Sequence, residues 1–240
     1  MRVLPTLIAD GATQMAWDEA LLDSAAVATL RTYRWVPPTV SLGYFQDHAD
    51  VRARLPPGMA VVRRITGGGA IWHEHEVTYA VIGTLGTDGW PATPRRLYQV
   101  LHAAILARLD GGRFALQAET TGDRRYRDEP RCFASPAVDD VVVAGGGKVL
   151  GSAARTRGRR VLVHGSLKLA SNPWDAATVA GCGLAFDAAR DALVAGVASA
   201  FATTAEPGAT TSDEIATMER IRNERYGSAG WVERREGRRP

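Results

Sequence analysis

The spacing of apolar residues along the chain predicts four helices, because apolar side chains recur three or four positions apart in each of them. The helices are expected at about residues 13–30, 93–110, 187–201 and 211–227. Thr13 is the expected N-cap of the first. Thr93 and Pro94 form an N-cap followed by proline, and Thr211 and Glu214 form a capping box, so two helices carry strong start signals.

Between these helices lie stretches in which β-branched and other apolar residues predict strands. The strands are expected at residues 60–65, 77–83, 138–143, 148–154 and 161–169. Most are joined by short turns rather than by helices, which favours a mixed, largely antiparallel sheet flanked by helices, an α+β fold, over a Rossmann series. The chain shows no internal repeat. We expect one catalytic domain over residues 1–230 and a flexible tail over residues 231–240.

The composition is typical of a globular protein, with 45% hydrophobic and 23% charged residues in 240. No apolar run is long enough to cross a bilayer, and two cysteines make neither a disulfide framework nor a zinc site. We therefore expect a cytoplasmic monomer without a metal site. The net charge is +3, and arginine-rich patches lack the interleaved aromatic residues of a nucleic-acid surface. Such patches could bind nucleic acid or steer an acidic protein partner, and solvated basic loops fit them equally well. We expect neither a nucleic-acid nor a membrane partner.

The segment from Arg63 to His73 carries three adjacent glycines, Gly67, Gly68 and Gly69. Glycines let the backbone approach a ligand closely. Arg63 and Arg64 end the preceding strand and point to opposite faces, so only one of them can face that ligand, where it can clamp a carboxylate or phosphate. A glycine-rich hairpin with surface arginines fits the same pattern. The segment is neither a Walker loop nor a dinucleotide-binding turn.

A second glycine cluster ends at Lys148, and Gly151, Ser152 and Ala153 follow it on the predicted strand. Their small side chains leave room for a thin ligand along the sheet. The Lys148 ammonium could then stabilise a carbonyl oxygen that gains charge during acyl transfer. An isolated lysine is usually only solvated, so this hypothesis depends on the surrounding pattern.

Two cysteines are candidate nucleophiles. Cys132 lies in a loop-like stretch with arginines upstream, and nearby cations favour a thiolate. Cys182, between Gly181 and Gly183, is the second choice. For either residue the alternative is a small buried side chain without a chemical role.

Taken together, these segments resemble the superfamily of lipoate–protein ligases, octanoyltransferases and biotin–protein ligases. The matching segments, in the order that the family uses, are residues 15–22, 41–46, 63–73, 147–153 and 164–166. The resemblance implies a mixed sheet like that of class II synthetases and biotin ligases, an acyl tunnel, and a lysine of a lipoyl domain or glycine cleavage H protein as acceptor. The substrate-binding residues implied by motif and resemblance are Arg63, Arg64, Thr66, Gly67, Gly68, Gly69, His73, Gly151, Ser152, Ala153, His164 and Gly165.

Within the superfamily, residues 132–136 and 73–79 look like those of octanoyltransferases that use an acyl-carrier-protein donor. This resemblance implies a thioester on Cys132, a role for Lys148 beside it, and no required cofactor. Gly69 instead follows the ligase form, and Cys182 lies about where another transferase branch keeps its nucleophile. The alternatives are a lipoate–protein ligase that needs ATP and magnesium, or a homologue that binds acyl groups or carrier protein without turnover.

Overall fold

The computed structural model describes residues 1–109, 112–122, 126–143, 146–177 and 179–237. Within them, nine strands form one sheet in the order β12-β1-β3-β7-β11-β10-β9-β8, with β2 also paired to β3. The strands are β1 (Arg2–Val3), β2 (Leu7–Ala9), β3 (Thr29–Trp35), β7 (Glu76–Thr84), β8 (Phe114–Leu116), β9 (Val141–Val143), β10 (Lys148–Arg157), β11 (Arg160–Lys168) and β12 (Glu206–Pro207). The central pairs are antiparallel, whereas β1 and β2 pair in parallel with β3. The predicted mixed, largely antiparallel sheet is confirmed.

A smaller sheet carries the elements around the first glycine cluster. It consists of β4 (Thr39–Leu42), β5 (Ala60–Arg63) and β6 (Ile71–His73), in the order β5-β4-β6. The short helix α2 (His48–Arg52) connects β4 to β5. The glycine segment therefore links β5 to β6 at the edge of this sheet.

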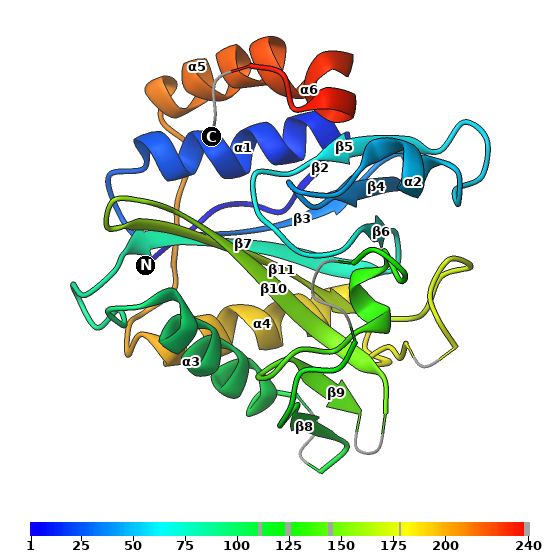
Figure 1. The fold of residues 1–240 in the computed structure, drawn as a ribbon. Coiled ribbons are helices and arrows are strands. Elements are labelled where there is room, and N and C mark those ends of the chain that lie inside the picture. Colours follow the sequence, from blue (N-terminus) through cyan, green and yellow to red (C-terminus); the bar gives the residue numbers. More distant parts are fainter. Residues whose placement is uncertain (110–111, 123–125, 144–145, 178, 238–240) are drawn as a thin grey trace.

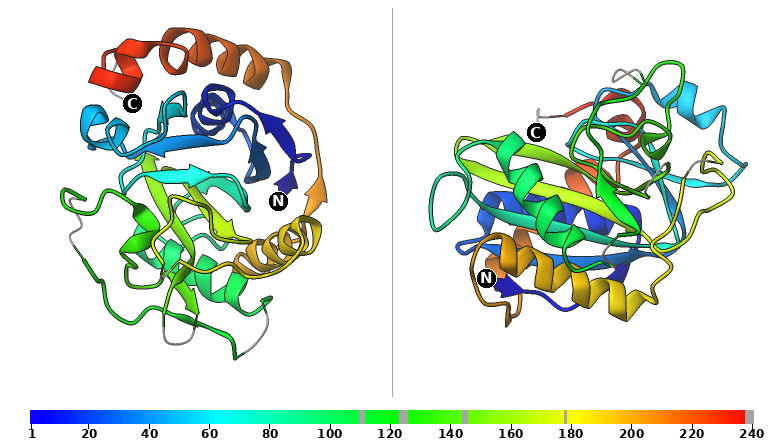
Figure 2. Two further views of the ribbon diagram at one scale, coloured as in Figure 1. Left: turned by 90° about the vertical axis from the view of Figure 1, so that its right-hand side faces the viewer. Right: turned by 90° about the horizontal axis from the view of Figure 1, so that it is seen from below.

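Helices cover both faces of the large sheet (Figure 1). The helix α1 (Gly11–Ser24) packs on one face, and α5 (Ser212–Ile221) and α6 (Ala229–Arg234) lie outside it. The helices α3 (Pro94–Leu106) and α4 (Phe186–Ala200) cover the opposite face, as the two further views also show (Figure 2). Each face has its own apolar core, with residues such as Leu22 and Ile82 on the α1 side and Leu101 and Val163 on the α3 side. Among the described helices, none is long and apolar enough to span a membrane.

The predicted start signals of two helices are confirmed. Thr93 caps α3, and Thr211 and Glu214 form the capping box of α5. The first helix, however, begins at Gly11, because Asp10 rather than Thr13 is the N-cap and accepts a hydrogen bond from the Thr13 amide.

The C-terminal segment corrects the expected tail at residues 231–240. Residues 231–234 belong to α6, and the Trp231 side chain is only 1% exposed. Its indole nitrogen donates to the carbonyl of Arg63 at 2.9 Å. The charged residues around Trp231 resemble a solvated tail in the sequence, but this one aromatic residue packs the segment onto the smaller sheet. Residues 238–240 lie outside the described part.

Candidate functional site

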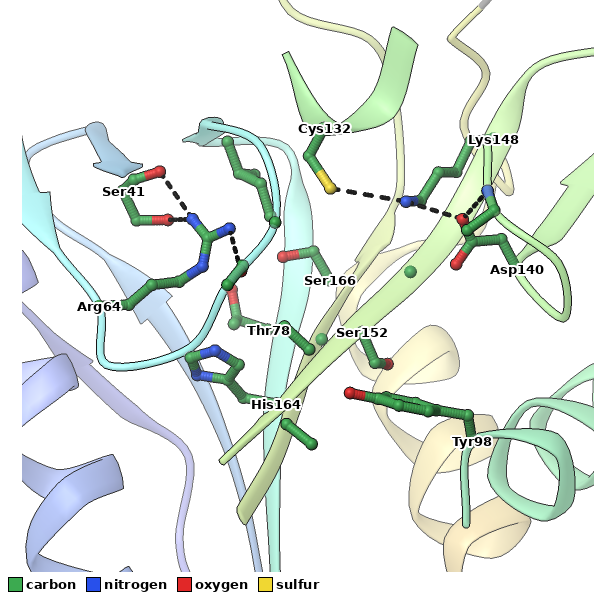
Figure 3. Close-up of a pocket in the computed structure, with 18 of the residues that line it drawn as sticks. Ser41, Arg64, Thr78, Tyr98, Cys132, Asp140, Lys148, Ser152, His164 and Ser166 are labelled. Carbon is green, nitrogen blue, oxygen red and sulfur yellow. Dashed lines mark hydrogen bonds and ion pairs between the residues drawn. The ribbon is translucent and has the colours of Figure 1, made fainter. Parts of the chain in front are cut away.

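A cavity of about 440 Å³ lies at the end of the large sheet where β10 and β11 meet the smaller sheet. The first glycine cluster and the strands β10 and β11 come together there: Gly67 and Gly68 line one side, and Gly151 and Gly165 line another, whereas none of the described glycines of the second cluster is part of the lining. Figure 3 shows side chains from both sheets and from α3 pointing into this space. The resemblance implied this shared site, whereas local pattern alone does not bring together segments more than 80 residues apart.

The nucleophile candidate Cys132 is brought to this cavity by backbone pairing. Cys132 begins a 3-10 turn, Cys132–Ala134, and its amide donates to the Ala70 carbonyl at 2.9 Å. The Ala70 amide in turn donates to the Pro130 carbonyl at 2.7 Å. A Cβ at Gly69 would lie 2.8 Å from the Cys132 nitrogen, so only glycine fits there. Gly69 therefore lets the turn at Cys132 pack closely against the glycine segment, and it is not itself part of the described lining.

Lys148 faces Cys132 across the cavity (Figure 3). Its Nζ lies 3.6 Å from Cys132 Sγ and 2.9 Å from Asp140 Oδ2, and only 3% of its side chain is exposed. Burial alone would lower the pKa of Lys148, but its ion pair with Asp140, together with the neighbouring Cys132, outweighs burial and raises that pKa above its usual value. The buried amine is therefore held as an ammonium. Ammonium and sulfur are placed for charge stabilisation and proton transfer.

A hydrogen-bond chain holds the backbone next to Asp140, whose carboxylate binds Lys148. Asp139, just before Asp140, has a left-handed φ of 70°, and its carbonyl accepts from His102 Nδ1 of α3 at 2.6 Å. Because burial lowers the pKa of His102, its ring is neutral and Nε2 accepts from Ser152 Oγ at 2.7 Å. Tyr79 completes the chain through its hydroxyl, 2.6 Å from Ser152 Oγ. Sequence reasoning missed Asp140 and His102, since nothing in the local pattern indicates this long-range pairing.

The two arginines have the opposite orientations that the sequence predicts, and Arg64 is the one that lines the cavity. Its guanidinium donates to the carbonyls of Gly67 and Gly69 at 2.9 and 2.7 Å, and to Ser41. Nη2 therefore holds the glycine segment in shape, and Nη1 ties the same guanidinium to β4 through Ser41. Arg63 faces away and donates to the carbonyls of Gly43 and Gln46, among others. Burial lowers the pKa of Arg63 to about 10.

His73 lines the cavity as part of a buried cluster. Its Nδ1 donates to Glu76 Oε1 at 2.6 Å, Nε2 is hydrogen-bonded to Ser41 Oγ at 2.7 Å, and its ring stacks on Trp35. Burial alone would raise the pKa of Glu76, but the hydrogen bond and charge of His73, the charge of Lys168 and a hydrogen bond from Thr78 hold that pKa at about 2. Glu76 is therefore a fixed carboxylate that orients His73.

His164 lines the cavity next to Ala153, its cross-strand partner. Its Nδ1 donates to Asp18 Oδ2 at 2.7 Å, and its Nε2 is 2.6 Å from Thr66 Oγ1. Asp18 also pairs with Arg31 at 2.6 Å. In the described structure Thr66 lies outside the lining, so its hydroxyl anchors the start of the glycine segment instead.

Cys182, the second candidate nucleophile, lies elsewhere. It belongs to the core on the α3 side of the sheet, and its side chain is 3% exposed. Burial raises the pKa of its thiol. Of the two thiols, only that of Cys132 lines the cavity as far as the structure is described. The same described residues contain no group of three or more histidine, cysteine or carboxylate side chains suited to a metal ion.

Known proteins match this chain over most of its length. The family model described as "Lipoyl protein ligase A/B catalytic domain" matches residues 10–202. Octanoyltransferase LipM of Moorella thermoacetica is 32% identical and covers 98% of both chains. Octanoyltransferase LipM of Kyrpidia tusciae is 31% identical, covering 92% of this chain and 94% of its own.

Solved structures share the fold. Protein Ta0514 of T. acidophilum with bound lipoic acid superposes with a TM-score of 0.77 at 19% identity, covering 96% of this chain and 98% of its own. Lipoate-protein ligase A bound with ATP gives a TM-score of 0.77 at 21% identity, covering 96% of this chain and 97% of its own. The resemblance first drawn from short motifs thus extends over nearly the whole length, and the chain belongs to the lipoyl protein ligase A/B catalytic domain family.

Proposed function

We propose that this protein is an octanoyltransferase of protein lipoylation. It would move an octanoyl group from acyl-carrier protein, through a thioester on Cys132, to a lysine of a lipoyl domain or glycine cleavage H protein. The observation that carries the proposal is the 3.6 Å separation of Lys148 Nζ and Cys132 Sγ at the cavity. The near full-length similarity to two proteins named octanoyltransferase supports the same reaction.

In the first step the Cys132 thiolate attacks the carbonyl carbon of the donor thioester. The developing oxyanion is stabilised by the Lys148 ammonium. The new carbon–sulfur bond forms as the bond to the donor sulfur breaks, and the departing thiolate takes a proton from Lys148. Acylation removes the thiolate charge that helps to raise the pKa of Lys148, so the proton leaves more readily at this stage.

In the second step the acceptor lysine enters as a neutral amine and attacks the acyl-enzyme. The carbon–nitrogen bond forms, the bond to Cys132 breaks, and the amine gives one proton to the now neutral Lys148. The thiolate and ammonium are thereby restored, and the net change is thioester plus amine to amide plus thiol. The thioester supplies the driving force, so the proposed reaction uses neither ATP nor a metal.

Intact-protein mass spectrometry tests the proposal. Purified protein is mixed with octanoyl–acyl-carrier protein without ATP, and a hydroxylamine-sensitive octanoyl adduct is expected on Cys132. Cys132→Ala should abolish the adduct and the transfer. Cys182→Ala is the matched control and should retain both, because Cys182 lies in the apolar core.

Three other results of this experiment would change the assignment. An adduct on Cys182 would keep the reaction but move the nucleophile. AMP release from ATP with octanoate or lipoate, without an adduct, would overturn the transferase in favour of a ligase. Well-folded protein that accepts no acyl donor would indicate a binding homologue.

A further inference from the structure

The cavity has a wall formed by one face of α3. Arg95, Tyr98 and His102 all line it, and their spacing of three and four residues places them on the same side of the helix. Exposure decreases along this row, from exposed Arg95 through partly buried Tyr98 to His102, which is 2% exposed. At 1.5 Å per residue, the row spans about 10 Å along α3. It therefore leads from the surface to the interior of the site.

The exposed lining residues mark where the cavity opens. They are Arg95 on α3, Thr120 after β8, and Val138 before β9. The Val138 amide donates to Thr120 Oγ1 at 3.1 Å, so these two residues form one side of the opening. Arg95 lies on α3, which forms the other side. We call these three residues the mouth.

The end of the cavity formed by α1 and β3 is buried and therefore closed to solvent. Met15, Tyr33 and Trp35 line it, and each is at most 5% exposed. Such an end suits a hydrocarbon chain. In a thioester the acyl chain and the sulfur are separate substituents of the carbonyl carbon. When the chain occupies the closed end and the carbon lies at Cys132, the sulfur and the arm behind it must leave toward the mouth.

We infer that the α3 row, Arg95, Tyr98 and His102, is the channel for the pantetheine arm of the acyl donor, with Arg95 binding the phosphate at its outer end. The inference rests on the proposed function and adds a donor subsite to it. No hydrogen bond or ion pair joins Arg95 to another described residue, so its guanidinium is available to an anion. Pro94 begins α3, and the first turn has no acidic residue, so the positive end of the helix adds to the charge of Arg95.

The next residue provides a matched control. Arg96 is also exposed in the first turn of α3, but it bonds to Gln99 Oε1 at 3.1 Å. In the described structure Arg96 is not part of the lining. The two arginines therefore share the same charge and helix end but differ in access to the channel.

The experiment compares two soluble donors, octanoyl-4′-phosphopantetheine and octanoyl-pantetheine, which lacks the phosphate. The measured quantity is kcat/KM for acylation of Cys132, followed by mass spectrometry. The wild type should prefer the phosphorylated donor by about fivefold, as expected for an exposed ion pair at a helix N-terminus. Arg95→Ala should remove this preference by slowing the phosphorylated donor alone, and Arg96→Ala should keep it.

Equal rates of the two donors with the wild type would overturn the phosphate site while leaving the transferase intact. Equal loss in Arg95→Ala and Arg96→Ala would overturn it too, because general attraction of anions would then explain the effect. Failure of both donors and of octanoyl–acyl-carrier protein to acylate Cys132 would overturn the proposed function and this inference together. Melting temperatures of the two variants would exclude misfolding as the cause.

Discussion

Glycines at positions 69 and 151 leave space that other protein atoms fill. In the sequence, Gly69 belongs to the first glycine cluster and Gly151 follows the second, and both predict room for a ligand. In the structure, the space at Gly69 is taken by the Tyr126 ring and the backbone of Pro130 and Cys132, and the space at Gly151 by the side chain of Lys148. The clusters therefore indicate the right region, but the atoms that require glycine come from segments whose approach no local pattern shows.

Gly151→Ala tests this role at the scale of one residue. The new Cβ would lie 2.1 Å from Lys148 Cε and 2.4 Å from Nζ, so the ammonium must move away from Cys132. Because small misplacements of reacting groups are costly, we expect kcat/KM for octanoyl transfer to fall by about 100-fold. Gly146→Ala is the control, since a Cβ there meets nothing within 4 Å. Unchanged activity of Gly151→Ala would show that the position of Lys148 is not critical.

At the scale of elements, local pattern succeeds where β-branched and other apolar residues cluster or where caps are present. The strands β5, β7, β9, β10 and β11 and the starts of α3 and α5 were predicted on that basis. The strand β3 was missed because the polar residues Arg31 and Thr32, which are buried in it, interrupt its apolar run. The charge of Arg31 is tolerated only because Asp18 of α1 pairs with it. Such compensation joins residues far apart in sequence and cannot be read from one segment.

The buried carboxylate of Glu76, the first residue of β7, predicts that the stability of the protein depends on pH. The pKa of Glu76 is lowered from 4.5 to about 2 in the folded protein. Its carboxylate therefore stabilises the fold at pH above about 4.5, and this contribution is lost as the pH falls towards 2. Urea denaturation across this pH range measures the free energy of unfolding. This free energy should fall less for Glu76→Gln, which cannot titrate, than for the wild type. Glu219 is exposed, so Glu219→Gln should behave as the wild type. The same change of unfolding free energy with pH in all three proteins would contradict the role of Glu76.

At the scale of the whole molecule, the end of the described chain packs against the support of the site. Trp231 of α6 donates to the Arg63 carbonyl, and Arg63 in turn donates to the carbonyl of Val232 at 2.9 Å. The same guanidinium holds the carbonyls of the loop after β4. A segment that reads as a tail therefore supports the strand that leads into the glycine segment.

Trp231→Ala should destabilise the protein by about 3–5 kcal/mol, as is typical for removal of a buried aromatic side chain. Ile215→Ala on neighbouring α5 is the control, because this side chain is 39% exposed and should cost about 0.5 kcal/mol. Chemical denaturation of both variants gives the two free energies of unfolding. Similar values would contradict the packing of α6 as a necessary part of the fold.

Because the exposed lining residues lie at one mouth, the donor and the acceptor would bind one after the other. Donor and acceptor would share this entrance, so the second carrier cannot insert its arm while the first still occupies the channel. The spent donor carrier then competes with the acceptor for the acyl-enzyme. Turnover in the cell would thus depend on the ratio of charged to uncharged carrier, as well as on the chemistry at Cys132.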